Sequence, residues 1–255
     1  MYLTVDIGNS TISSGIFKDN TLKSAWSQPS NKVEILHHFY SYLVEHLLQH
    51  RLSPYDINHC ILSSVHPENT PIVIQILEEH NIHYTLFNRA KFSKLPIHIP
   101  NIQEIGADIV ANTLGAHQHY RGDKVIIDFG TALTITGLSK EDTLLGVNIC
   151  PGINTSITAL TGATQLLHEV PIELPKNALG DTTTTAIQNG IVKGYIGMIK
   201  NALKDIEAEY HSNFQCILTG GQCQIMAPLL GLPCIIDRYL PLKGLHCFAL
   251  QLDSQ

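Results

Sequence analysis

Two stretches of the chain carry an aspartate, two glycines and small polar side chains in the same order. Asp6 ends an apolar run and is followed by glycine two and nine residues later. Asp128 begins the same pattern 122 residues further on (128 − 6 = 122). In each copy, the alternation of apolar and turn-forming segments predicts a strand, a tight turn and a returning strand.

Both predicted turns have the composition of an anion-binding loop. Gly8 and Gly130 would let the backbone approach a ligand closely, because glycine has no side chain to obstruct it. Asn9, Ser10 and Thr131 add amide and hydroxyl groups to the turn amides. We expect these groups to bind the oxygen atoms of a phosphate.

The two aspartates suit a cation better than a phosphate. A bare carboxylate would repel phosphate, so Asp6 and Asp128 are expected to hold a metal ion between themselves and the anion. Taken singly, an Asp-x-Gly sequence after a strand is more often a plain turn, in which Asp accepts backbone hydrogen bonds. Two copies at matched spacing instead favour a duplicated domain whose hairpins face a cleft.

A third carboxylate stands at the predicted start of a helix from about residue 103 to residue 120. Asp108 follows Gly106 and Ala107, and a carboxylate there could take the proton of a substrate hydroxyl. General-base assistance of this kind contributes ~10²- to 10⁴-fold to a rate. The helix dipole and backbone amides are expected to favour its charged form. From the residues alone, a helix-capping aspartate is an equally good interpretation.

The elements that position these residues alternate in type along the chain. In the first half we expect strands at 3–15 (a hairpin), 21–26, 60–65 and 83–87, and helices at 31–50 and 68–80, with a loop at 89–101. The face of the first helix that is expected to be buried consists of Val33, Leu36, Tyr40, Leu43, Val44 and Leu47.

The second half repeats this order. After its hairpin we expect a strand at 143–149, helices at 154–164, 182–210 and 222–230, a strand at 214–219, and a docked apolar tail at 240–252. The prediction is an α/β fold of two duplicated domains, an arrangement that resembles ribonuclease-H-like, actin-like domains. Each has a mixed five-stranded sheet with helices on both faces. The domains are expected at residues 1–118 and 119–255.

Composition narrows the class of protein. The chain has 255 residues, of which 44% are apolar and 15% charged, as in a compact globular protein. A net charge of −6 supplies no basic surface, so no nucleic-acid partner is expected. No apolar run reaches membrane-spanning length, and the first residues lack a basic leader, so we expect a cytoplasmic protein without a membrane partner. The six cysteines form no CxxC pair and are expected to be buried, reduced thiols.

The ordered set of motifs resembles type III pantothenate kinase, a family of the actin, Hsp70 and sugar-kinase superfamily, over essentially the whole chain. The matching segments are Asp6-Ile7-Gly8-Asn9-Ser10, Gly106-Ala107-Asp108, Asp128-Phe129-Gly130-Thr131, Pro151-Gly152, Gly180 to Gly190, and Leu218-Thr219-Gly220-Gly221. No single motif is specific, but the set is. The resemblance implies ATP-dependent phosphorylation of pantothenate, the first step of coenzyme A biosynthesis, by a homodimer that needs Mg²⁺ and a monovalent cation, K⁺ or NH₄⁺.

The resemblance also implies residue roles. Asp108 would be the general base, Asp128 the ligand of the monovalent cation, and Asp6 a ligand of Mg²⁺ through water. The implied ATP-binding residues are Asp6, Ile7, Gly8, Asn9, Ser10, Thr11, Ile12, Ser13, Thr131, Gly220 and Gly221. The implied substrate-binding residues are Gly106, Ala107, Asp108, Ile109, Thr183 and Ile99. Thr183 is identified by counting back seven residues from Gly190, so a slip of one within Thr182 to Thr185 stays open.

Departures from the family concentrate where the acceptor would bind. Ile109 stands where the family usually has Arg, Ile99 where many members have Tyr, and Val147 where a second Gly is usual. An anionic partner left without its Arg would weaken binding by ~2–5 kcal/mol. Two alternatives to an active pantothenate kinase therefore stay open: a divergent, non-catalytic regulatory paralogue that binds nucleotide, and a kinase for another small hydroxylated acceptor. Three retained aspartates and Thr131 favour an enzyme.

Overall fold

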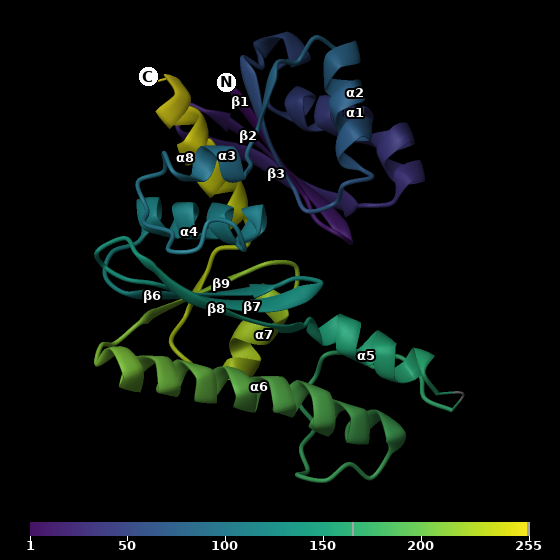
Figure 1. The fold of residues 1–255 in the computed structure, drawn as a ribbon. Coiled ribbons are helices and arrows are strands. Elements are labelled where there is room, and N and C mark those ends of the chain that lie inside the picture. Colours follow the sequence, from purple (N-terminus) through teal and green to yellow (C-terminus); the bar gives the residue numbers. More distant parts are fainter. Residues whose placement is uncertain (165, 254–255) are drawn as a thin grey trace. The chain divides into compact units, whose positions relative to one another are not determined.

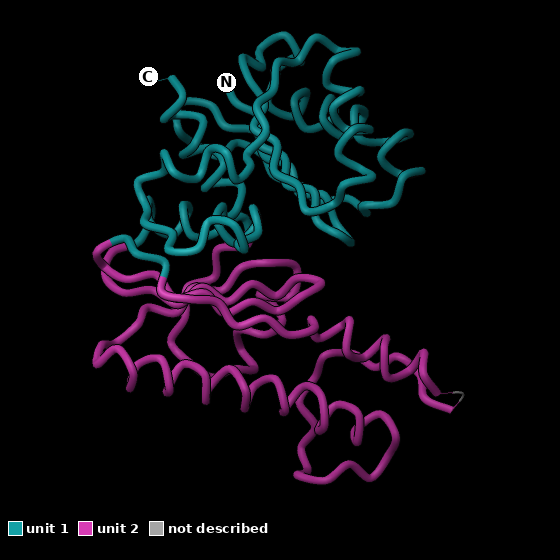
Figure 2. The backbone as a smooth tube through the Cα atoms, in the orientation of Figure 1, with its two compact units in different colours: residues 1–120, 142–144, 239–255 teal, residues 121–141, 145–238 magenta. Residues whose placement is uncertain are grey.

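Two five-stranded mixed sheets organise the chain, one in each of two units (Figures 1 and 2). The computed structural model describes residues 1–164 and 166–253. The first unit comprises residues 1–120, 142–144 and 239–255, and the second comprises 121–141 and 145–238. The domain boundary expected between residues 118 and 119 stays a prediction; the contact-based division starts the second unit at Arg121 and assigns the C-terminal helix to the first.

The first sheet has the strand order β3-β2-β1-β4-β5. Its strands are β1 (Tyr2–Ile7), β2 (Thr11–Lys18), β3 (Thr21–Pro29), β4 (His59–Ser64) and β5 (Tyr84–Leu86). β1 pairs with β2 antiparallel and with β4 parallel, so the first three strands are a meander and the rest is parallel. This is the mixed sheet that the sequence predicts.

Helices cover both faces of the first sheet. The helical segments are α1 (Lys32–Gln49), the 3₁₀ turn η1 (Pro54–Asp56), α2 (Thr70–Glu79), α3 (Arg89–Phe92), α4 (Ala107–His119) and α8 (Leu240–Asp253). α1 and α2 bury the side of β1 that carries Leu3, Val5 and Ile7. The other side packs on α8, where a Cβ on Gly15 would be 3.2 Å from Cδ1 of Leu242. The docking expected of the apolar tail is thereby confirmed.

The buried face of α1 differs in part from the predicted one, since Leu43 and Leu47 are buried as expected but other members are not. Ile35, Phe39, Leu43 and Leu47 form the buried stripe, whereas Val33 and Leu36 are exposed. The sequence offers two overlapping apolar stripes at helical spacing, and periodicity alone does not say which one faces the sheet. The expected loop at 89–101 also contains the short helix α3.

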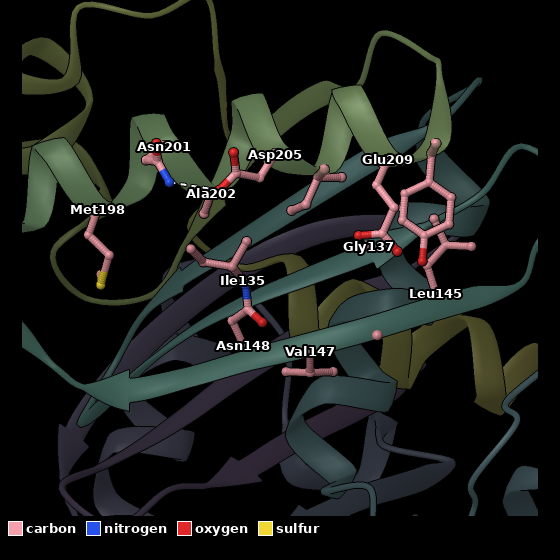
Figure 3. Close-up of a pocket in the computed structure, with 13 residues that line it drawn as sticks. Ile135, Gly137, Leu145, Val147, Asn148, Met198, Asn201, Ala202, Asp205 and Glu209 are labelled. Atoms are coloured by element: carbon pink, nitrogen blue, oxygen red, sulfur yellow. Dashed lines mark hydrogen bonds between the residues drawn. The ribbon is translucent and has the colours of Figure 1, made fainter.

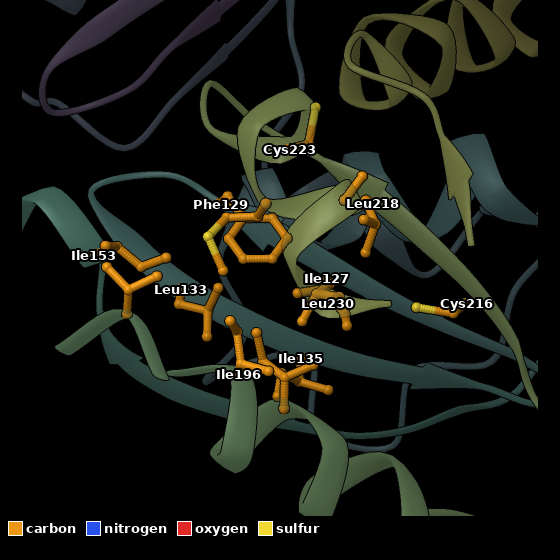
Figure 4. Packing of buried hydrophobic residues seen from close by; sticks show 14 of the residues in the cluster. Ile127, Phe129, Leu133, Ile135, Ile153, Ile196, Cys216, Leu218, Cys223 and Leu230 are labelled. Atoms are coloured by element: carbon orange, nitrogen blue, oxygen red, sulfur yellow. The ribbon is translucent and has the colours of Figure 1, made fainter. Parts of the chain in front are cut away.

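The second sheet has the order β10-β9-β6-β7-β8. Its strands are β6 (Lys124–Phe129), β7 (Ala132–Leu138), β8 (Leu144–Pro151), β9 (Gln215–Thr219) and β10 (Ile235–Ile236); the last was not anticipated. Its helices are α5 (Ile153–Gly162), α6 (Thr183–Tyr210) and α7 (Cys223–Leu230). Side chains of the sheet and all three helices share one core, part of which Figure 4 shows.

The two Asp-Gly hairpins are similar but not equal in length. Asp6 lies opposite Ser13, seven residues later, whereas Asp128 lies opposite Thr134, six residues later. The turn of the first hairpin, Gly8–Ser10, is therefore one residue longer. The second glycines, Gly15 and Gly137, are equally spaced from their aspartates in the sequence, but they do not occupy equivalent positions in the two strand pairs.

Two further expectations concern cysteines and membranes. All six cysteines are free thiols, four of them buried and two half-buried, which confirms reduced and largely buried side chains. Of the helices in the described part of the chain, none combines the length and the apolar character needed to cross a bilayer.

Candidate active site

The turn between β1 and β2 is tightly closed. The Gly8 amide donates to the Thr11 carbonyl at 2.9 Å, and a Cβ on Gly8 would be 3.0 Å from that same oxygen. The Asn9, Ser10 and Thr11 side chains are exposed. The turn thus offers polar side chains and main chain to a ligand.

Not every residue of the predicted phosphate loop can contact a ligand through its side chain. Ile7 and Ile12 are 0% exposed and belong to the core under α1 and α2, so only their main-chain atoms could take part. Asp6 is half-buried and lies in register between Ser13 on β2 and Ser63 on β4. Paired residues of adjacent strands point to the same face. Asp6 therefore stands in a row of hydroxyl groups.

Asp108 is the second residue of α4, and its carboxylate folds back over the start of the helix. A Cβ on Gly106, the N-cap residue, would be 2.4 Å from Oδ1 of Asp108. Only a glycine leaves room for this orientation. The sequence expectation of a carboxylate at a helix start is met.

The pKa of Asp108 shifts in the direction opposite to the one expected. Burial raises the pKa of its carboxyl group, and hydrogen bonds from the backbone amides of Ile109 and Asp108 offset only part of that effect. We expected the helix start to favour the charged form. The net shift is upward because the loss of water around this partly buried carboxyl group outweighs those hydrogen bonds.

The two apolar departures from the family pattern are packed side chains. Ile109 is 7% exposed and Ile99 is 6% exposed. Cδ1 of Ile109 lies 4.0 Å from the Cβ position of Gly106, so Ile109 packs beside the segment that carries Asp108. Ile99 and Ile109 are thus core residues of the first unit.

In the second unit, Asp128 lies against the turn that follows β9. A Cβ on Gly220 would be 2.3 Å from Oδ1 of Asp128 and 2.8 Å from the backbone N and C atoms of Phe129. The φ of +86° at Gly220 also favours glycine. Gly221 is exposed, and a Cβ there would touch nothing within 4 Å. Close packing therefore requires glycine at position 220, whereas position 221 has room for a side chain.

The Pro151-Gly152 segment holds the second hairpin turn. The Gly152 amide donates to the Thr131 carbonyl at 2.8 Å, and the Thr155 hydroxyl donates to the same oxygen at 2.7 Å. A Cβ on Gly152 would fall 2.2 Å from the Gly130 oxygen. The N-cap residue of α5 is Gly152.

Tyr195 contributes to the same support. Its hydroxyl donates to the Pro151 carbonyl and lies 2.6 Å from the Ser156 hydroxyl. The structure makes Tyr195 a link between α6 and the start of α5.

The four threonines at the start of α6 differ in their hydrogen bonds. Thr182 and Thr185 form a capping box, and Thr184 lies 3.2 Å from Nε2 of His168. Thr183 is exposed, and in the described part of the chain its hydroxyl makes no hydrogen bond. Of the four, Thr183 has the hydroxyl group that is best placed to serve a ligand.

Two buried polar residues beside the first turn were not singled out from the sequence. Ser30 follows β3, and Asn69 precedes α2; they are 5% and 4% exposed. The Ser30 hydroxyl donates to the Gly8 carbonyl at 2.7 Å. A usable signal exists, since both are small polar residues just beyond strands of the sheet that holds the turn.

The donor set suits cations that are held mainly by water and substrate oxygens. Among the described residues, no three His, Cys, Asp or Glu side chains gather as a metal cage. Beside Asp6, the Ser63 hydroxyl is fully buried and lacks a hydrogen-bond partner within the described structure, which fits a hydrated Mg²⁺ ion nearby. At the turn that holds Gly220, the Asp128 carboxylate is the group that could serve a second cation.

A groove of about 380 Å³ lies elsewhere in the second unit, between β7, β8 and the C-terminal half of α6 (Figure 3). Its floor includes Ile135 and Val147, and Asp205 and Glu209 stand at its helical side. It contains none of the predicted site residues. Val147 thus belongs to this groove rather than to either hairpin turn.

Comparison with known proteins connects these features to a family. The family model described as type III pantothenate kinase matches residues 2–205. A type III pantothenate kinase of Sulfurihydrogenibium sp. is 34% identical over 251 residues, covering 96% of this chain and 98% of that protein. A second, from Dehalococcoides mccartyi strain BAV1, is 32% identical over 254 residues, covering 99% and 96%.

Solved structures show the same fold at lower identity. A Campylobacter jejuni protein described as a Baf family transcriptional activator has a TM-score of 0.64 at 18% identity, covering 99% of this chain and 100% of that one. The 2-hydroxyisocaproyl-CoA dehydratase activator of Clostridium difficile, with bound ADPNP, has a TM-score of 0.56 at 12% identity, covering 100% and 96%. Together with the two five-stranded sheets, these likenesses confirm the predicted actin-like fold class.

Proposed function

Because the chain belongs to the type III pantothenate kinase family, we propose that its catalytic residue is Asp108 and that its ligands bind at the two hairpin turns and the α4 and α6 helix starts. The protein is a phosphotransferase that uses ATP to phosphorylate pantothenate in coenzyme A biosynthesis. The observation that carries the catalytic proposal is the partly buried carboxylate of Asp108, folded over Gly106.

Asp108 is the general base. The primary hydroxyl oxygen of pantothenate attacks the γ-phosphorus of ATP, the bond from that phosphorus to the β–γ bridging oxygen breaks, and ADP leaves. The hydroxyl proton passes to the Asp108 carboxylate. A raised pKa suits this role, because a more basic carboxylate takes the proton more readily.

The first hairpin binds the phosphates. Asn9, Ser10, Thr11 and Ser13 offer side-chain donors, while Gly8, Ile7 and Ile12 contribute main chain only. Asp6 would hold Mg²⁺ through water, and the Ser63 hydroxyl is its neighbour on β4. When bound, Mg²⁺ would neutralise charge on the phosphate oxygens.

Residues of the second unit bind the monovalent cation and the adenosine part of ATP. Asp128, whose carboxylate lies against the turn at Gly220, would bind K⁺ or NH₄⁺. Thr131 contacts ATP from a turn whose main chain is fixed by Gly152. Gly221 is exposed and presents a flat main-chain surface to the adenosine.

Pantothenate binds near the start of α4 and to Thr183. Gly106 and Ala107 offer main chain next to the base, and the Thr183 hydroxyl is the one of its group not engaged in the capping box or with His168. The packed side chains of Ile99 and Ile109 give this part of the first unit an apolar character. The acceptor is therefore recognised by hydrogen bonds and apolar contact rather than by an Arg at position 109.

A homodimer and a cytoplasmic location complete the proposal. Both rest on the family and on the composition of the chain. If the acceptor pocket is shared between subunits, activity per subunit falls on dilution into the monomeric range.

The decisive experiment is ADP release from ATP, with and without pantothenate, in K⁺ and in Na⁺ buffer. We expect turnover that requires pantothenate and K⁺ and is lost in Asp108→Asn. Nucleotide binding without pantothenate-dependent turnover would instead favour a regulatory paralogue or another hydroxylated acceptor, and these two are separated by offering other small hydroxylated acids.

A further inference from the structure

Ser30 forms two hydrogen bonds to the main chain of the first hairpin turn. The Ser30 hydroxyl donates to the Gly8 carbonyl at 2.7 Å, and the Ser30 amide donates to the Ser10 carbonyl at 3.0 Å. A third carbonyl, that of Thr11, accepts from the Gly8 amide. Three carbonyl groups in and beside the turn are thereby engaged within the protein.

Ser30 is itself held by Asn69. The Asn69 side-chain amide donates to the Ser30 carbonyl and lies 3.1 Å from the Ser30 hydroxyl. Asn69 is the N-cap residue of α2, yet its side chain makes no capping hydrogen bond. Asn at this position normally bonds the helix amides and stabilises the helix by about 1 kcal/mol. Here the side chain serves Ser30 instead.

Ser30 does not cap the helix that follows it, α1. Asn31, the next residue, caps α1 by accepting from the Glu34 amide at 2.9 Å. Ser30 and Asn69 are both more than nine-tenths buried, so solvent competes little for their hydrogen bonds. Their contacts are directed to the turn and to each other rather than to helix capping.

The physical consequence concerns phosphate binding. A carbonyl oxygen carries partial negative charge and repels a phosphate, whereas backbone N–H groups that converge on one point attract it. A turn binds phosphate well when its carbonyls are turned away and fixed in that orientation. Ser30 fixes two of them.

We propose that Ser30 and Asn69 are positioning residues for phosphate binding, which hold the Gly8 and Ser10 carbonyls away from the ATP phosphates. This inference rests on the proposed function of the turn. Neither residue touches ATP, so their loss weakens ATP binding without removing a direct contact.

The test compares kinetic constants of three variants with the wild type. Ser30→Ala removes the hydroxyl donor, and Asn69→Ser removes the amide donors while keeping a good N-cap residue for α2. Ser14→Ala is the matched control: Ser14 is also a fully buried serine of this sheet, and its hydroxyl has no hydrogen-bond partner in the described structure.

For Ser30→Ala we expect a rise of about tenfold in the KM for ATP, as for the loss of one buried hydrogen bond. Asn69→Ser should give a smaller rise, and Ser14→Ala none. The KM for pantothenate and the kcat at saturating ATP should stay within about twofold, because the turn does not contact the acceptor. Amide hydrogen exchange at residues 8–11 should quicken in Ser30→Ala without nucleotide, and exchange in α1 should not change.

Three results would overturn the inference: an unchanged KM for ATP in both variants, an equal rise of both KM values, or unchanged exchange at residues 8–11. If Ser30→Ala does not fold, Asn69→Ser carries the test alone. Restoration by Ser30→Thr, which keeps a hydroxyl, would separate the hydrogen bond from packing. A wild type without pantothenate-dependent turnover would refute the proposed function instead, and the exchange measurement would still test the contact.

Discussion

Gly106 and Asp108 are matched in space: a Cβ on Gly106 would fall 2.4 Å from Oδ1 of Asp108. The carboxylate therefore occupies the volume that any other residue at position 106 would take. Because this position is an N-cap with extended backbone (φ −75°), its glycine is required by the carboxylate and not by the local conformation. Gly106, which has no functional group, therefore determines where the Asp108 carboxylate can lie.

Gly106→Ala should reduce kcat by about tenfold or more, because a misplaced catalytic group costs rate steeply. The protein should stay folded, since alanine fits the backbone conformation at position 106. Steady-state kinetics at saturating ATP and pantothenate measure the effect. Gly197→Ala is the control, since a Cβ there meets nothing within 4 Å and should leave kcat unchanged. A full kcat in Gly106→Ala would show that the carboxylate can work from another orientation.

Asp108→Asn should abolish turnover and stabilise the fold at neutral pH. Burial raises the pKa of Asp108 in the folded state, so the native protein holds this proton more tightly than the unfolded chain. Ionisation therefore costs stability as pH rises through the raised pKa, and the cost is absent below the usual carboxyl range near pH 4. The melting temperatures of the wild type and of Asp108→Asn should therefore differ at pH 7 and become similar at pH 4. Equal melting temperatures at pH 7 would contradict the raised pKa.

Asp128→Asn should raise the KM for ATP and remove the difference between K⁺ and Na⁺. An amide keeps the shape of the carboxylate but lacks its charge, so the monovalent cation would lose its main attraction. The ratio of activities in the two salts, measured for both proteins, is the test. Persistent K⁺ dependence in Asp128→Asn would place the cation elsewhere.

The main elements of both sheets could be predicted from the sequence because hairpin and alternation signals are local. The buried face of α1 could not: two apolar stripes overlap there, and packing against the sheet selects Ile35 and Phe39 over Val33 and Leu36. The two-residue strand β10 also has no local signal of its own, since it forms by pairing with β9. Tertiary contacts decide both features.

At the site, residue types and spacing identified the aspartates and glycines but not their environment. The raised pKa of Asp108 depends on burial, which no local pattern reports. Ser30 and Asn69 are 39 residues apart in the sequence. The order of the strands brings together the segments that follow β3 and β4, beside the turn between β1 and β2. Such supporting contacts follow from strand order rather than from motifs.

Ile109→Ala tests whether the apolar side chain next to the base serves the acceptor as well as the core. Removing most of a 7% exposed isoleucine should cost about 2–4 kcal/mol of stability through the cavity it leaves. If Ile109 also shapes the pantothenate site, the KM for pantothenate should rise several-fold while the KM for ATP stays the same. Thermal melts and the two KM values measure this.

Val110→Ala is the control for Ile109→Ala, because Val110 is 0% exposed on the same helix but was not predicted to contact the acceptor. It should lower the melting temperature without changing either KM. A pantothenate KM that rises equally in both variants would mean that loosening α4, and not the loss of Ile109, weakens acceptor binding. An unchanged KM in Ile109→Ala would assign the residue to packing alone, and the acceptor would then depend on Thr183 and the main chain at Gly106.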